Sequence, residues 1–240
     1  MSEEMDVAPD VGDLRSRLLG NYQLIEVLVF LFLIVPSMAL SFFLVRPGGL
    51  SFSFVAVSTI VRDLALVSLV LYFLWRNGET RESLGWVFKK RQADLILGVA
   101  LFLPFLVGAS FLDRTLQGLG FSAPATPLPA FLHAEGPAEV LLATVLVAVV
   151  AWGEETIFRG YLMLRFQGLN FTPLGRALLS AAIFALGHGY EGSAGVLTVG
   201  AMGFAFALMY LWRGSLVAPM AMHFLLDFSS IVLPALVGTR

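Results

Sequence analysis

Long apolar runs with few or no charged side chains divide this sequence. The run Leu95–Leu112, for example, contains no charged residue. A transmembrane helix needs about 20 predominantly apolar residues, and a backbone surrounded by lipid satisfies its hydrogen bonds only in helices or closed barrels. The chain is 58% hydrophobic and only 13% charged, whereas about a quarter of the residues in soluble domains are charged. The pattern predicts an all-α, polytopic transmembrane helical bundle surrounded by membrane lipids.

Breaks in the apolar pattern define about seven candidate spans. They are Tyr22–Val45, Phe54–Trp75, Leu95–Leu112, Ala138–Gln167, Pro173–Leu186, Gly195–Trp212 and Ser215–Leu236. A Pro-rich loop, Gly118–Pro137, separates the third span from the fourth. In the second span, we interpret Arg62 and Asp63 as an ion pair at the membrane interface.

Lys and Arg are distributed unevenly between the predicted loops. The loop between the second and third spans contains Arg76, Arg81, Lys89, Lys90 and Arg91, whereas only Arg114 lies near the Pro-rich loop. Cytoplasmic loops carry an excess of Lys and Arg, so the first loop and the N-terminus are expected in the cytoplasm. The acidic N-terminus lacks the basic region of a secretory signal, and we expect residues 1–20 to form a disordered cytoplasmic tail.

Charge and cysteine content exclude several classes of function. The formal net charge of −2, without a basic run, argues against nucleic acid as a partner. Cysteine is absent, which excludes a disulfide framework, a thiolate nucleophile and a thiolate-bound metal. Any metal would therefore need histidine and carboxylate ligands.

Ionisable residues gather in three short clusters in the second half of the chain. The clusters are Glu154 and Glu155 with Arg159, Phe184 with His188, and His223 with Asp227. An ionisable side chain at bilayer depth costs about 2.5–3.5 kcal/mol on insertion scales. Such residues inside apolar runs therefore indicate function.

Helical spacing suggests a role for each carboxylate. Residues four apart share one face of a helix, so Glu155 is predicted to pair with Arg159, and Asp227 to orient His223. Glu154 lies about 100° around the helix from Glu155 and is free to face another partner. We therefore predict that Glu154 is the catalytic base.

Depth along the helices can be compared from the turn at residues 168–173. Glu154 and His188 both lie roughly 21–22 Å from this turn at 1.5 Å per residue, so they can face each other. At the same rise per residue, His223 lies roughly 13 Å beyond the turn at Arg213 and Gly214. The Gly-rich stretch Gly187–Gly195 is where we expect a broken helix to absorb the difference.

Several functions fit these residues. A carboxylate and two imidazoles in one wet cavity could activate water and stabilise the oxyanion formed in peptide hydrolysis. The same side chains, Glu154, His188 and His223, could instead bind a divalent metal such as zinc. The rival functions are a transporter or proton relay and a non-catalytic membrane scaffold of the bacteriocin-immunity type. Residue types alone leave these alternatives open.

In order and spacing, the three clusters resemble the motifs of the CPBP family, also called the Abi family, which comprises type II CAAX prenyl endopeptidases and bacteriocin-processing proteins. The resemblance covers about residues 138–232 and implies an intramembrane endopeptidase. It also implies that Glu154 with His188 activates the attacking water, and that His223 with Asp227 forms the oxyanion site. We interpret Phe184 as a packing residue that shapes the pocket beside His188.

The resemblance also sets expectations for mechanism, substrate and location. Family members are described both as metalloproteases and as metal-free glutamate proteases. In prenyl-processing members the position of Asp227 is often Asn; because an ionised Asp cannot donate a hydrogen bond, Asp227 is expected to orient His223 or to be protonated. The expected substrate is a membrane-associated or lipidated peptide or protein, in a membrane of the bacterial type. Residues 21–137 would form N-terminal transmembrane helices with the Pro-rich loop, and 138–240 the catalytic core in the last four spans.

Overall fold

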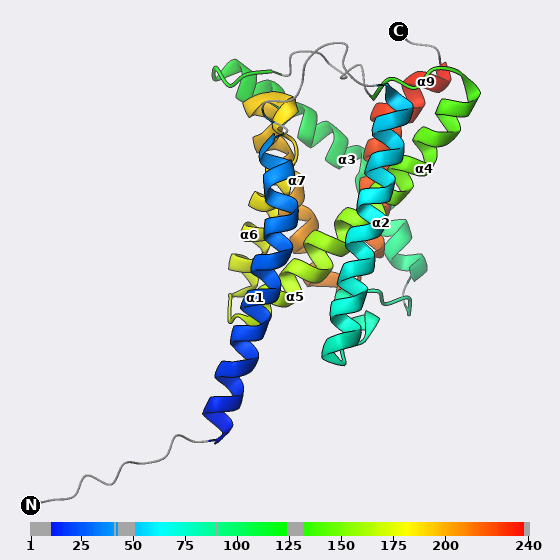
Figure 1. Cartoon of the computed structure of the whole chain (residues 1–240). Helices are drawn as coiled ribbons and strands as arrows, with labels where there is room; N and C mark the ends of the chain where they lie inside the picture. The colour runs from blue at the N-terminus through cyan, green and yellow to red at the C-terminus, as the bar shows by residue number, and fades with distance from the viewer. Residues whose placement is uncertain (1–10, 41, 43–50, 90, 124–131, 238–240) are drawn as a thin grey trace, which may run out of the picture.

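The computed structural model describes residues 11–40, 42, 51–89, 91–123 and 132–237, and every regular element in these ranges is helical. The elements are α1 (Val11–Leu40), α2 (Phe52–Asn77), η1 (Arg81–Leu84), α3 (Arg91–Gly118), α4 (Gly136–Glu154), η3 (Glu155–Leu162), α5 (Met163–Gly168), α6 (Pro173–Leu186), η4 (Gly189–Glu191), α7 (Gly192–Arg213), α8 (Val217–Asp227), η5 (Phe228–Val232) and α9 (Leu233–Val237). Figure 1 shows them as an open bundle of long helices. The predicted all-α fold is confirmed.

Among the described residues, six helices are long and apolar enough to cross a membrane. Two of them are composite, because α4, η3 and α5 continue one another over Gly136–Gly168, and α8, η5 and α9 do so over Val217–Val237. The remaining predicted span, α6, is apolar but has only 14 residues. The protein is therefore an integral membrane protein with six long spans and one short apolar helix.

Helix ends follow local sequence signals. The hydroxyl of Ser51 accepts a hydrogen bond from the backbone N–H of Phe54 at the start of α2, and Thr172 caps α6 in the same way, directly before Pro173. Gly78 ends α2 with φ of 70°, in the left-handed region where glycine is favoured because it lacks a Cβ. These caps fix the lengths of the two helices.

The predicted disordered tail, residues 1–20, overlaps the first helix. Residues 1–10 lie outside the described residues, but α1 begins at Val11, so the prediction of disorder was wrong for residues 11–20. The physical reason is that nucleation is the costly step of helix formation. A helix already formed by the adjoining apolar run extends toward the N-terminus one residue at a time.

The continuous helix α4–η3–α5 lies at the centre of the bundle. Helix α2 packs along α4, α6 along α7, and α3 along α8. The largest buried cluster includes Phe30 of α1, Phe73 of α2 and Tyr161 of η3. The rings of Phe30 and Tyr161 lie 4.8 Å apart. The two N-terminal helices are thereby joined to the helices that carry the polar clusters.

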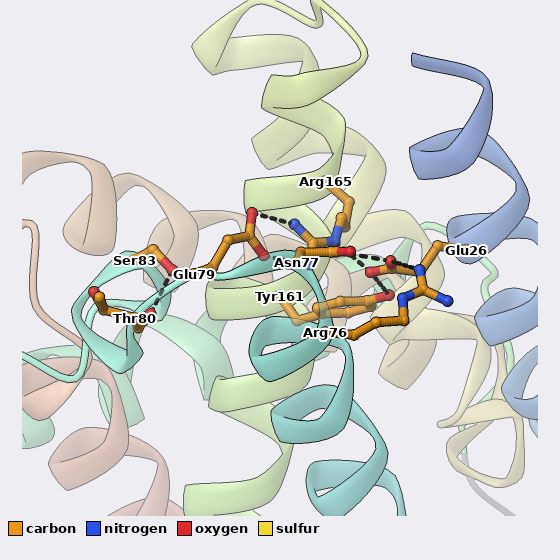
Figure 2. A network of polar contacts seen from close by, with 8 residues as sticks. All are labelled: Glu26, Arg76, Asn77, Glu79, Thr80, Ser83, Tyr161 and Arg165. Carbon is orange, nitrogen blue, oxygen red and sulfur yellow. Dashed lines mark hydrogen bonds and ion pairs between the residues drawn. The ribbon is translucent and has the colours of Figure 1, made fainter. Parts of the chain in front are cut away.

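A buried network of charges closes one end of this core (Figure 2). Glu26 of α1 accepts hydrogen bonds from Arg76, Asn77, Tyr161 and Arg165, at 2.6–3.0 Å. Arg165 also binds Glu79 through two nitrogens, at 2.8 and 2.6 Å. The network, which we call the Glu26–Arg165 network, fastens α1 and the end of α2 to η3 and α5.

Candidate active site

A cavity of about 810 Å³ lies in the other half of the bundle. Glu154, His188, His223 and Asp227, the four predicted catalytic residues, all line it. They come from the end of α4, the turn after α6, and α8. Residues from three separate segments thus line the same cavity, as the clusters in the sequence suggested.

Glu154 is the last residue of α4, where the helix changes to the π-helical segment η3. Such segments are rare and are frequent at functional sites. Its carboxylate Oε2 lies 3.9 Å from Nε2 of His223, and its side chain is 16% exposed. Glu154 therefore faces the cavity with one oxygen close to an imidazole and still accessible to a ligand.

His223 is held by a carboxylate that the sequence did not assign to it. Its Nδ1 lies 2.9 Å from Oε1 of Glu155, whereas the Nε2 atom is 3.4 Å from Oδ2 of Asp227. When Nδ1–H donates to Glu155, Nε2 is the atom presented to the cavity. Glu155 thus occupies the orienting position that we had predicted for Asp227. No local pattern reveals this contact, because it depends on how α8 packs against η3.

The predicted pair of Glu155 and Arg159 is present, at 2.9 Å, and both side chains are fully buried. The guanidinium also lies over the ring of Phe184, 4.2 Å from its centroid, and 5.5 Å from that of Phe206. A cation over an aromatic face is attracted by the ring quadrupole. The ring contacts supplement the single carboxylate, because Nε and Nη2 of Arg159 have no hydrogen-bond partner among the described residues.

Gly203 of α7 makes room for this stack. A Cβ at this position would lie 2.7 Å from Nη2 of Arg159 and 2.9 Å from Cδ1 of Phe184. A side chain here would therefore displace Arg159 or Phe184.

His188 occupies a break between helices. Helix α6 ends at Leu186, and the short η4 follows before α7 begins, as predicted for the Gly-rich stretch. Nδ1 of His188 lies 3.2 Å from the carbonyl oxygen of Phe184. The Phe184 ring is 4.8 Å from the ring of His188 and 6.1 Å, edge-on, from that of His223. Phe184 therefore contacts both imidazoles of the site.

The predicted ion pair of Arg62 and Asp63 is present, whereas its position at the membrane interface stays a prediction. They lie in the interior of α2 and line the cavity. Nη2 of Arg62 is 2.9 Å from Oδ1 of Asp63, whose side chain is only 2% exposed. Ionisable residues are tolerated at depth when they face a polar cavity rather than lipid. The cavity, which hydropathy alone does not show, therefore explains their position.

The side chains proposed as zinc ligands do not form a metal site as they are arranged. Within the described ranges, no three His, Asp or Glu residues are grouped closely enough to hold a metal ion. Three or four ligands at about 2 Å are needed for zinc. Of the three proposed ligands, Glu154 and His223 lie 3.9 Å apart, but His188 does not complete a group of three among the described residues.

Comparison with known proteins agrees with the geometry. Residues 136–229 match the family model described as type II CAAX prenyl endopeptidase Rce1-like. The match begins at the start of α4 and ends within η5, so it spans all three polar clusters. Neither the curated proteins nor the solved structures contain a significant match to the chain.

Proposed function

We propose, taking the Rce1-like domain of residues 136–229 as the premise, that this membrane protein is an endopeptidase that uses water activated by Glu154 and His188. The substrates would be membrane-associated or lipidated peptides or proteins. The observation that carries the proposal is that Glu154, His188 and His223 line one cavity. Its volume of about 810 Å³ is within the usual range of ligand pockets, about 300–1,000 Å³.

The first step would be proton removal from water. A carboxylate within hydrogen-bond reach of a water can act as its general base. Glu154 takes the proton as the water oxygen attacks the carbonyl carbon of the scissile bond. The carbonyl oxygen becomes an oxyanion, and the protonated Glu154 or His188 then passes a proton to the departing amine.

His223 would stabilise the oxyanion. In the imidazolium form both ring nitrogens donate hydrogen bonds, Nδ1 to Glu155 and Nε2 to the oxyanion. The 2.9 Å contact with Glu155 fixes the ring before substrate arrives. Donors that are already oriented stabilise the developing charge without reorganisation in the transition state. Asp227, 3.4 Å from the same Nε2, lies where it can assist the oxyanion when it carries a proton.

A transporter or proton relay is a weaker interpretation of the same residues. Transport requires access to the central site from both membrane faces. The cavity lies in one half of the bundle, whereas the Glu26–Arg165 network fills the core at the other end. This arrangement favours a site that opens to one face.

The proposal is tested by substituting the base. The purified protein in detergent is assayed for cleavage of a peptide library, and Glu154→Gln is expected to lose at least about 100-fold in kcat, the lower range for a general base. The matched control is Glu139→Gln on the same helix, where a partly exposed carboxylate accepts hydrogen bonds from Ser53 and from the backbone N–H of Glu135. Equal activity of Glu154→Gln and wild type would refute the mechanism.

A further inference from the structure

In four of the long helices, α1, α2, α3 and α7, the residues that line the cavity lie mainly in one half of the helix, whereas in the composite helix Gly136–Gly168 they lie near its middle. In α1 they run from Leu33 to Met38, near the end of that helix, and in α2 from Val55 to Leu66, in its first half. In α3 they run from Leu106 to Asp113, and in α7 from Gly195 to Phe206. Because neighbouring helices run in opposite directions, all of these segments lie toward the same end of the bundle.

Figure 1 shows the same arrangement, with the end of α1 and the starts of α2, α4 and α7 together in the upper part of the view. The segment η1 lies in the lower part, beyond the end of α2. The cavity therefore lies toward the end of the bundle that is opposite η1. Ser230 of η5 and Leu132, which precedes α4, complete the lining on this side.

Basic residues concentrate at the opposite end. Arg76, Arg81, Lys89, Lys90 and Arg91 occur from the end of α2 to the start of α3, and Arg15, Arg17, Arg176 and Arg213 are at the η1 end of α1, α6 and α7. The last turn of α3, the segments that join α1 to α2 and α3 to α4, and the C-terminal residues contain only Arg114, Arg46 and Arg240. Short cytoplasmic loops carry the excess of Lys and Arg, so the η1 end faces the cytoplasm.

Acidic groups characterise the cavity end. Asp113 of α3 and Glu191 of η4 line the cavity, and the exposed Glu135 and the partly exposed Glu139 lie at the start of α4. Among the described residues that line the cavity, Arg62 is the single basic residue apart from histidine, and Asp63 pairs with it. The cavity and its end of the bundle therefore both carry acidic groups and few basic ones. This is the opposite of the excess of Lys and Arg expected on a cytoplasmic face.

We infer that the catalytic cavity opens to the extracytoplasmic side of the membrane, and that the substrate is a peptide segment exposed on that side. The inference rests on the proposed peptidase function for the identity of the substrate, but the side of access follows from the structure and the charge distribution alone. The Glu26–Arg165 network lies toward the opposite, cytoplasmic end of the bundle, and none of its members lines the cavity.

The absence of cysteine allows a direct test by single-cysteine labelling of the full chain. Ser230→Cys places a thiol in the cavity, and Ser83→Cys in η1 places one at the opposite end. Both are isosteric changes outside the proposed catalytic groups. Intact cells are treated with a charged, membrane-impermeant maleimide before and after permeabilisation. We expect Ser230→Cys to react in intact cells, and Ser83→Cys to react only after permeabilisation.

The result that overturns the inference is the reverse pattern, or protection of Ser230→Cys until the cells are permeabilised. A second measurement separates access from catalysis: a membrane-impermeant peptide that the purified enzyme cleaves is added outside intact cells. Cleavage by wild type but not by Glu154→Gln supports external access. External labelling of Ser230→Cys together with no cleavage by the purified enzyme would refute the peptidase function and leave the access route standing.

Discussion

Nδ1 of His223 and Oε1 of Glu155 lie 2.9 Å apart, although the two residues are 68 positions apart in the chain. The same Glu155 oxygen is 2.9 Å from Nη1 of Arg159. One buried carboxylate therefore joins an imidazole that faces the cavity to a guanidinium that does not reach it. We assign Glu155 as a positioning residue, because it would act on the substrate only through His223.

The first prediction concerns this contact. Glu155→Gln keeps the side-chain shape and an acceptor oxygen but removes the charge that the imidazolium and Arg159 share. We expect kcat to fall about 10- to 100-fold, as for other groups that orient a ligating or catalytic histidine, whereas KM changes little because Glu155 is buried behind the cavity wall. Steady-state kinetics with one peptide substrate measure both constants.

Two outcomes would contradict this assignment. A rise in KM without a change in kcat would show that Glu155 serves binding, and wild-type kinetics would show that His223 needs no partner. Glu155→Ala provides the structural comparison, because removing one member of a buried ion pair costs about 3–5 kcal/mol. If Glu155→Ala fails to fold and Glu155→Gln folds but has a lower kcat, the two roles of Glu155 are distinct. The first result would report its support of Arg159, and the second its orientation of His223.

A second prediction concerns Asp227, whose Oδ2 is 3.4 Å from Nε2 of His223. Asn can donate a hydrogen bond to an oxyanion from the same position, whereas Ala cannot. Asp227→Asn is therefore expected to retain activity within about tenfold of wild type, and Asp227→Ala to lose about 100-fold in kcat, the cost of one oxyanion donor. If both variants lost activity equally, the negative charge of Asp227 would be the required feature.

A third prediction concerns the Glu26–Arg165 network. Arg165 has a side chain that is 1% exposed and binds both Glu26 and Glu79. Arg165→Met leaves two carboxylates with fewer partners and should lower the free energy of unfolding by about 3 kcal/mol, the lower end for a broken buried pair, because Arg76 still binds Glu26. Thermal unfolding in detergent measures the loss.

The double variant Glu26→Gln with Arg165→Met provides the control for that experiment. Removing the charge of Glu26 should recover part of the lost stability, since coupled residues are not additive. At temperatures where the single variant is folded, kcat should stay near that of wild type because the network lies outside the cavity. Full additivity of the two changes would mean that Glu26 and Arg165 do not depend on each other.

The fourth prediction concerns metal. Within the described ranges, no three His, Asp or Glu residues converge as a ligand set, and the proposed hydrolysis needs only Glu154 and the two histidines. Treatment with a strong zinc chelator, followed by removal of the chelate, should therefore leave kcat within about twofold, a change below 0.5 kcal/mol in activation free energy. Loss of activity that added zinc restores would overturn the metal-free mechanism.

Much of the fold could be predicted because the bilayer imposes a simple rule. Long apolar runs must be helical, and six of the seven predicted spans are long helices while Pro173–Leu186 is a short apolar one. The pair of Glu155 and Arg159 was also predictable, since residues four apart on a helix are neighbours whatever the rest of the chain does.

Features that depend on packing between helices could not be predicted in this way. The contact between Glu155 and His223 requires the relative rotation of η3 and α8, and hydropathy contains no information about that angle. The surroundings of Arg62 and Asp63 could not be predicted for a related reason, because only the packing of the helices shows that both residues line a cavity. The π-helical segment η3 likewise has no local signal comparable to a proline or a cap.

The Glu26–Arg165 network has a consequence for the cell as well as for the fold. A polar hollow that reaches halfway through a bilayer shortens the distance over which the membrane potential falls, and small ions would cross readily if the remaining half were loosely packed. In that half, ion pairs and hydrogen bonds join α1, α2 and α5, and the rings of Phe30, Phe73 and Tyr161 pack beside them. This half of the bundle is therefore closely packed. The protein can therefore contain a water-accessible active site without conducting ions across the membrane.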